Sequence, residues 1–148
     1  MGQTTIADEE VRSPESGEVL IRTEVTLISP GTERAFLLGL PNTPRHFPRK
    51  YGYCNVGEII ELGSGVSGAA VGDRVLSGGN HAQFVVVSAG NVFRIPEEVP
   101  SREAVFANLT SISIQAVRKA SIELGEPVLI IGQGLIGNLA LQLSRLSG

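Results

Sequence analysis

The chain of 148 residues is long enough to bury one sizeable core but short for two complete domains. Its 42% apolar and 18% charged residues are typical of a globular protein rather than a disordered or fibrous one. The net charge of −3 argues against nucleic acid as a partner, and we find neither a secretory leader nor an apolar run of membrane-spanning length. We therefore expect a soluble cytoplasmic protein that has neither nucleic acid nor a membrane as its partner.

The first hundred residues contain several short strand patterns. Residues 18–28 alternate apolar with more polar side chains from Val19 to Leu27, which predicts a strand with one buried face. Four further strands are predicted at residues 56–62, 73–77, 82–88 and 91–96. Turns rich in glycine separate them, and the spacing is typical of a small antiparallel barrel or sandwich.

The pattern changes after Pro100. Ser101 is placed to cap a helix with Glu103 in its first turn, and apolar residues then recur at helical spacing as far as Val117. Residues 128–131 form an apolar run that predicts a buried strand leading into a second helix. The sequence thus predicts a β-rich part to about residue 100, a connecting helix and the β–α beginning of something else.

The turn between that strand and helix carries a specific glycine pattern. Gly132, Gly134 and Gly137 have the Gly-x-Gly-x-x-Gly spacing of a dinucleotide-binding turn. The first glycine permits the tight turn, the second lets a pyrophosphate approach the backbone, and the third lets helix and strand pack closely. The alternative interpretation is a turn that serves packing only. The residue that would distinguish NAD from NADP is expected about 20 positions further on, beyond this sequence.

Three sequence stretches together resemble a known family. They are Gly31–Glu33 (Gly-Thr-Glu), Gly72–Val75 (Gly-Asp-Arg-Val) and the glycine turn, and in this order they are similar to the N-terminal part of the medium-chain dehydrogenase/reductase superfamily. That superfamily includes zinc alcohol dehydrogenases and quinone oxidoreductases. The resemblance covers nearly the whole chain and implies a mostly β fold with some α.

The resemblance also implies a domain plan and an activity. Residues 1–122 would form a chaperonin-10-like (GroES-like) β-barrel, and residues 123–148 the first β–α unit of a truncated NAD(P)-binding Rossmann domain. A cofactor, NAD or NADP, would exchange hydride with an alcohol or carbonyl compound. We expect the chain to be an N-terminal fragment of a homo-oligomeric protein of roughly twice this length, and to be inactive alone. The implied cofactor-binding residues are Thr110, Gly132, Gln133, Gly134, Leu135, Ile136 and Gly137.

The sequence departs from the zinc-dependent members at both ligand positions. Pro30 stands where those members carry a cysteine, and Tyr53 where they carry the histidine of a Gly-His-Glu stretch. Neither residue type is a zinc ligand. Cys54 is the single cysteine, so the four-cysteine structural zinc lobe is missing too. We expect no zinc, with protein groups handling the proton.

The resemblance implies three catalytic candidates, each with a structural alternative. Thr32 matches a hydroxyl that relays a proton, or it caps the following short helix. Tyr53 would point into the cleft and donate a proton or orient a carbonyl, or it is a half-buried core residue. Cys54 is reactive, or it is a buried inert thiol. Glu33 corresponds to an acidic residue behind the metal, which here caps a helix or pairs with an arginine.

The remaining polar residues leave further alternatives open. His46 and His81 have no short ligand spacing, so an unconventional metal site is weighed against loop or strand-end histidines. The basic stretch at residues 45–50 has two interpretations. It binds an anionic substrate or a cofactor phosphate, or it is a loop face exposed to solvent. As a whole, the chain belongs to an oxidoreductase or is a noncatalytic module that binds partners through its apolar C-terminal helix. That helix carries Leu135, Ile136, Leu139, Leu141 and Leu143.

Overall fold

The computed structural model describes residues 3–147 and divides into two compact units. The first unit ends at Val105 and the second begins at Phe106. The predicted domain boundary, between residues 122 and 123, lies further along the chain. It stays a prediction, and the two units are described one at a time.

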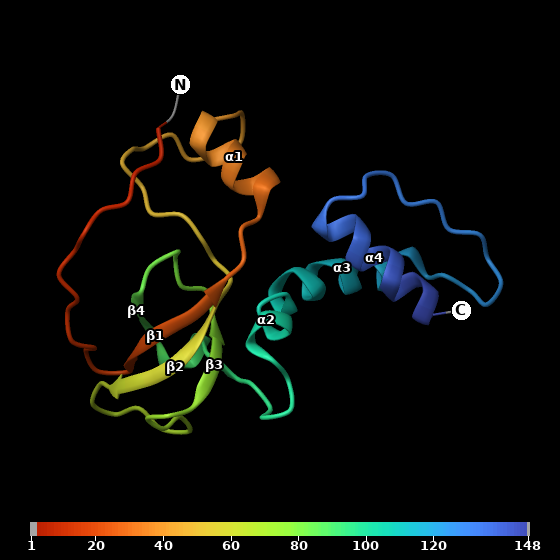
Figure 1. Cartoon of the computed structure of the whole chain (residues 1–148). Coiled ribbons are helices and arrows are strands. Elements are labelled where there is room, and N and C mark those ends of the chain that lie inside the picture. The colour runs from red at the N-terminus through yellow and green to blue at the C-terminus, as the bar shows by residue number, and fades with distance from the viewer. Residues whose placement is uncertain (1–2, 148) are drawn as a thin grey trace. The chain divides into compact units, whose positions relative to one another are not determined.

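The first unit is built on one antiparallel sheet (Figure 1). Its strand order is β4-β1-β2-β3-β5, and all neighbouring pairs run antiparallel. The strands are β1 (Glu18–Thr26), β2 (Asn55–Leu62), β3 (Arg74–Ser77), β4 (Phe84–Ser88) and β5 (Phe93–Arg94). Each of the five strands expected in the first hundred residues is therefore present, and the predicted mostly β fold class with some α is confirmed.

The core of this unit follows the period of two along β1. Val19 and Ile21 are fully buried and Arg22 is exposed. Leu20 is also buried, so the start of β1 is covered on both faces. The buried cluster consists of Val19, Ile21, Ile59, Val75 and Val85. It joins four of the five strands and gives the sheet a rigid face from which the neighbouring loops project.

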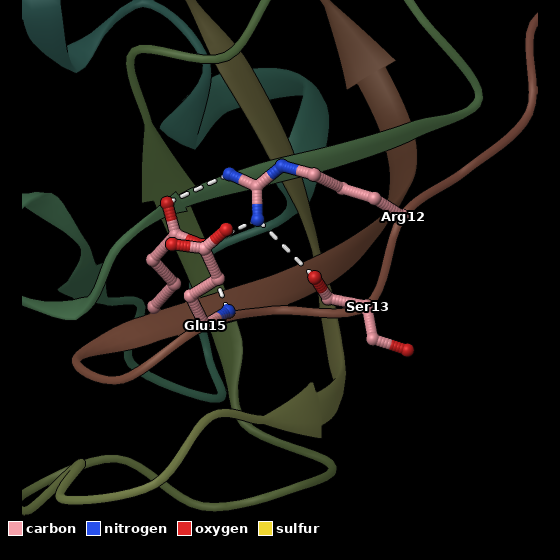
Figure 2. Close-up of polar contacts among 4 residues, drawn as sticks. Arg12, Ser13 and Glu15 are labelled. Atoms are coloured by element: carbon pink, nitrogen blue, oxygen red, sulfur yellow. Dashed lines mark hydrogen bonds and ion pairs between the residues drawn. The ribbon is translucent and has the colours of Figure 1, made fainter.

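A charged contact joins Arg12, in the segment before the sheet, to Glu18 at the start of β1 (Figure 2). The Arg12 guanidinium donates two hydrogen bonds to the Glu18 carboxylate, at 2.6 and 2.8 Å. The backbone N–H of Glu15 donates a third at 2.9 Å. These donors, the Arg12 side chain first, lower the pKa of Glu18 from its ordinary 4.5 to about 2.

This lowered pKa predicts how the contact responds to acid. The stabilisation is fully present above pH 4.5, the value expected for Glu18 in the unfolded chain, and is lost as the pH falls toward 2. In an NMR titration, the Glu18 carboxyl should titrate with a midpoint near 2. In Arg12→Gln the midpoint should rise toward 4.5. A midpoint near 4.5 in the unaltered protein would contradict the contact.

The helices after the sheet begin differently from the prediction. Pro100 occupies the N-cap of α2 (Ser101–Ala104), so the expectation that Ser101 caps this helix is wrong. The Ser101 hydroxyl instead donates to the Glu24 carboxylate at 2.5 Å. Because that carboxylate lies on β1, a tertiary contact has replaced the local cap.

The second unit contains two helices that lie side by side, α3 (Ala107–Ala120) and α4 (Leu135–Leu146) (Figure 1). Leu109, Ser113 and Val117 are the buried side of α3. The Ser113 hydroxyl lies 3.1 Å from the Leu109 carbonyl oxygen and 3.2 Å from that of Ile136, which ties α3 to the first turn of α4. The apolar stripe of α4 is half-buried at Leu135, Leu139 and Leu143.

The strand predicted at residues 128–131 does not form. The segment from residue 122 to residue 134 belongs to no helix or strand, and Leu129 and Ile131 are 85% and 90% exposed. A strand is stable only when a neighbouring strand pairs with its backbone. In the described part of the second unit the other regular elements are helices, so the apolar run has no ladder to join. Within residues 3–147, no helix is both long and apolar enough to cross a bilayer.

Candidate functional site

A cavity of about 330 Å³ lies in the first unit, between α1 (Pro30–Leu38) and the segment that leads into β2. Its volume is at the lower end of the range for small-molecule pockets. The walls combine hydroxyl, aromatic and charged side chains. The lining residues are Thr32, Glu33, Phe36, Arg49, Lys50, Tyr51, Gly52, Tyr53 and Asn80.

Helix α1 presents Thr32 and Glu33 to this cavity because of how the helix starts. Ser29 is the N-cap, and Pro30 follows it in the first turn, where a missing N–H costs nothing. The cap is completed by Glu33, whose Oε1 accepts the Ser29 backbone N–H at 2.7 Å. Thr32 lies inside the helix rather than at its cap, and its side chain is exposed at the cavity. Thr32 is therefore not the cap of this helix, and its role toward a substrate stays a prediction.

The opposite wall, residues 51–53, is held from both sides by backbone hydrogen bonds. The Tyr51 carbonyl accepts the His81 N–H at 2.7 Å, and the Cys54 carbonyl accepts the Leu27 N–H at 3.0 Å. Tyr53, between these two anchors, is half-buried and lines the cavity. The wall therefore has a defined position although it is not part of a helix or strand.

A polar chain links α1 to the sheet behind the cavity. His81 Nε2 lies 3.0 Å from Glu33 Oε2, and His81 Nδ1 lies 2.8 Å from Thr26 Oγ1. A carboxylate only accepts hydrogen bonds, so Nε2 carries the hydrogen and donates a hydrogen bond to Glu33. In the neutral ring, Nδ1 then accepts the Thr26 hydroxyl proton. The sequence indicated a loop or strand-end position for His81, and its pairing with Glu33, 48 residues earlier, becomes visible only in the fold.

Arg49 is the second residue whose role the sequence left open. Its guanidinium carbon lies 4.2 Å from the Phe36 ring centroid and 5.8 Å from that of Tyr51. The side-chain atoms Nε and Nη1 are buried, and neither has a hydrogen-bond partner in residues 3–147. Arg49 is therefore part of the cavity wall, whereas Arg45 and His46 of the same basic stretch are exposed and do not line it.

The three catalytic candidates from the sequence are not all brought together. Thr32 and Tyr53 both line the cavity. Cys54 is fully buried at the entrance to β2 and is not among the lining residues. That position fits the interpretation of an inert packing thiol, and a catalytic role for Cys54 stays a prediction that the cavity does not support.

The glycine turn in the second unit requires glycine at two of its three positions. Gly132 has φ +94°, a conformation that side chains rarely adopt. A Cβ on Gly137 would lie 1.8 Å from the Gly132 carbonyl oxygen, so only glycine allows α4 to start so close to the turn. A Cβ on Gly134, the N-cap of α4, would meet nothing within 4 Å. The second glycine thus leaves the open space that a phosphate needs to approach the backbone.

The other predicted cofactor residues lie on or near this turn or on α3. Gln133 is exposed beside Gly134, Leu135 begins α4 half-buried, and Ile136 offers its carbonyl oxygen to Ser113. Thr110 lies on α3 and is half-buried. Contacts of these residues with a cofactor stay predictions.

Comparison with known proteins identifies the family. The family model described as the alcohol dehydrogenase GroES-like domain matches residues 15–97, more than half of the chain. The chain therefore belongs to this family, and the predicted resemblance to medium-chain dehydrogenases is confirmed.

Individual relatives agree with the family assignment. A D-guloside 3-dehydrogenase of Shigella flexneri is 35% identical over 96 residues, which is 63% of this chain and 27% of that protein. A chloroplast envelope quinone oxidoreductase homolog of Arabidopsis thaliana is 31% identical over 158 aligned positions, 93% of this chain and 46% of that protein. The chain thus spans between about a quarter and a half of the length of these relatives.

A solved structure covers almost the whole chain. It is a protein of Sinorhizobium meliloti 1021, provisionally assigned as a zinc-binding dehydrogenase and bound to NADP. The two chains superpose with a TM-score of 0.87 at 25% identity, over 99% of this chain and 51% of that one. Residues 3–147 therefore have the fold of about half of that longer chain.

The side chains of the cavity do not fit a zinc ion. Glu33 is the one lining residue of a type that commonly binds zinc, and its two oxygens already accept hydrogen bonds from Ser29 and His81. Tyr53 and Pro30 occupy the positions at which the resemblance would place ligands. Across residues 3–147, no three His, Cys, Asp or Glu side chains gather closely enough to hold a metal. Glu33 and His81 do meet, but no third ligand joins them.

The close approach at Gly137 predicts a strong effect of a single methyl group. Gly137→Ala should loosen the start of α4, because the new Cβ would collide with the Gly132 carbonyl, which belongs to the backbone. Amide hydrogen exchange should then become faster in α4 while β1 and β2 are unchanged. Gly134→Ala is the matched control, since its Cβ enters open space. Equal exchange in both variants would contradict the tight contact.

Proposed function

We propose that the chain is the N-terminal part of an NAD(P)-dependent oxidoreductase that transfers hydride between nicotinamide and an alcohol or carbonyl compound without catalytic zinc. The observation that carries this proposal is the cavity, which combines the hydroxyls of Thr32 and Tyr53 with no set of zinc ligands. Family membership supports the oxidoreductase class. Residues 1–122 would belong to the substrate-binding domain, and residues 123–148 would open the cofactor domain.

In this proposal the protein's own groups handle the proton. When an alcohol is oxidised, its carbon loses a hydride and its oxygen loses a proton, which needs an acceptor. Thr32 and Tyr53 are placed on the cavity surface, where a substrate hydroxyl can reach them. Behind them, Glu33, His81 and Thr26 form a continuous hydrogen-bonded chain that can hold or pass on a proton.

The cofactor would be held at the glycine turn. The backbone of residues 132–137 provides the tight bend, the open approach at Gly134 and the first turn of α4, where backbone N–H groups lack intrahelical acceptors. When bound, the nicotinamide cofactor supplies the hydride chemistry. The relative from Sinorhizobium meliloti was solved with NADP, which supports a nicotinamide cofactor for this chain.

The absence of a zinc requirement is tested on the longer protein that contains this chain. We expect reduction of NAD or NADP by an alcohol substrate to continue at an unchanged rate after dialysis against a strong chelator. The rate should not rise when zinc is added back. Loss of activity on chelation, with recovery on zinc addition, would contradict the proposal. Absence of cofactor binding and of turnover would favour the noncatalytic binding module.

The two hydroxyls are tested by removing one oxygen at a time. Thr32→Val and Tyr53→Phe keep side-chain size, and we expect at least one to lower kcat by about 100-fold, a typical loss for a proton-transfer group. Thr43→Val is the matched control, because the Thr43 hydroxyl bonds the Leu40 carbonyl and does not line the cavity. If kcat is unchanged in both cavity variants, neither hydroxyl takes part in the proton transfer.

A further inference from the structure

We propose that the cavity is a site for an anionic substrate, a small hydroxy or carbonyl compound whose carboxylate or phosphate group pairs with Arg49. This inference narrows the substrate class and, in that respect, rests on the proposed function. The anion site itself depends only on residues of the cavity.

Arg49 has unmet hydrogen-bonding capacity within residues 3–147. Nε and Nη1 together carry three of the five guanidinium N–H donors. Both atoms are buried, and no acceptor in residues 3–147 lies within hydrogen-bond range of them. Buried N–H donors of a charged group are costly to leave unpaired, so such groups mark places where a ligand completes the bonding.

Two aromatic rings lie close to the Arg49 guanidinium. Phe36 lies 4.2 Å from the guanidinium carbon, within stacking range, and Tyr51 is the more distant ring at 5.8 Å. A ring that contacts the face of a guanidinium uses its charge but not its N–H groups, which point outward in the guanidinium plane. The ring contacts therefore engage the charge of Arg49 without satisfying its N–H donors.

The charged side chains around the cavity differ in their partners. Lys50 also lines it, but its ammonium pairs with the Glu9 carboxylate. The Glu33 carboxylate accepts from Ser29 and His81. Within residues 3–147 no ion pair joins Arg49 to a carboxylate, so its guanidinium has no direct counterion, and a bound anion would supply one.

The position of Arg49 on the cavity wall indicates which other groups the ligand carries. Thr32, Tyr53 and Arg49 line the same space of about 330 Å³, so one small molecule can present a hydroxyl to the first two and an anionic group to the third. A planar carboxylate and a tetrahedral phosphate each present two oxygens that a guanidinium can bind as a pair. We therefore name the class as short anionic hydroxy compounds.

The test uses three probes that differ in charge but share a short hydroxylated carbon skeleton. Glycerol 3-phosphate, glycerate and glycerol are titrated into the 148-residue chain, and binding is followed by calorimetry and by NMR shifts of the residues around the cavity. We expect one or both of the anions to bind at least about tenfold more tightly than glycerol. Which of the two binds better distinguishes a phosphate from a carboxylate ligand. Equal binding of all three, or binding of none, would overturn the inference.

Substitution of the arginine shows whether it forms the site. Arg49→Gln should weaken binding of the preferred anion by at least about tenfold, and Arg49→Lys, which keeps the charge but not the fork of donors, should weaken it less. Arg45→Gln is the matched control, because it removes the same charge from an exposed residue that does not line the cavity. If Arg49→Gln fails to fold, Arg49→Lys and the probe series decide. Equal effects at the two positions would indicate a general charge effect and overturn the inference.

The outcome is separable from that of the proposed function. Anion binding that depends on Arg49, without hydride transfer in the longer protein, would uphold the anion site and reject the oxidoreductase. Turnover of neutral alcohols at a rate that Arg49→Gln leaves unchanged would uphold the oxidoreductase and reject the anion site. Neither result depends on the other, because the titration needs no cofactor.

Discussion

The Glu33 carboxylate holds the candidate site together. Helix α1 has no fully buried residue, so apolar packing alone gives it little hold on the sheet. Glu33 supplies a specific attachment, because one oxygen completes the helix cap at Ser29 and the other accepts from His81. His81 in turn contacts Thr26 at the end of β1. The wall that carries Thr32 is thus positioned by a polar chain.

The sheet supplies the rigidity on which this chain depends. Asn55, fully buried at the start of β2, donates to the Thr23 hydroxyl at 2.7 Å and accepts from Ser77 at 3.3 Å. These contacts join β1, β2 and β3 immediately after Tyr53 and Cys54. The cavity wall therefore leaves the sheet from a point where the polar groups are satisfied, as buried polar groups must be. A site on loops can be well defined when both of its ends are anchored in this way.

The differences between expectation and structure have one physical origin. Alternation along residues 18–28 and the glycine pattern at residues 132–137 are local, and both correspond to the observed strand and turn. The apolar run at residues 128–131 has strand character too, but a strand requires hydrogen bonds from a neighbour that local sequence does not provide. Ser101 is of a residue type that caps helices, yet its hydroxyl donates to the Glu24 carboxylate on β1.

By itself, the sequence determined where the strands of the sheet lie along the chain, the family and the glycine turn. Each of these depends on residues a few positions apart. It also placed Thr32 and Tyr53 among the candidates through the resemblance. Only the tertiary structure brought His81 to Glu33 and placed the Arg49 guanidinium over the Phe36 ring. Such contacts depend on how distant segments meet around a core. The burial that leaves arginine N–H groups without an acceptor, or that orients a histidine, is a property of that arrangement.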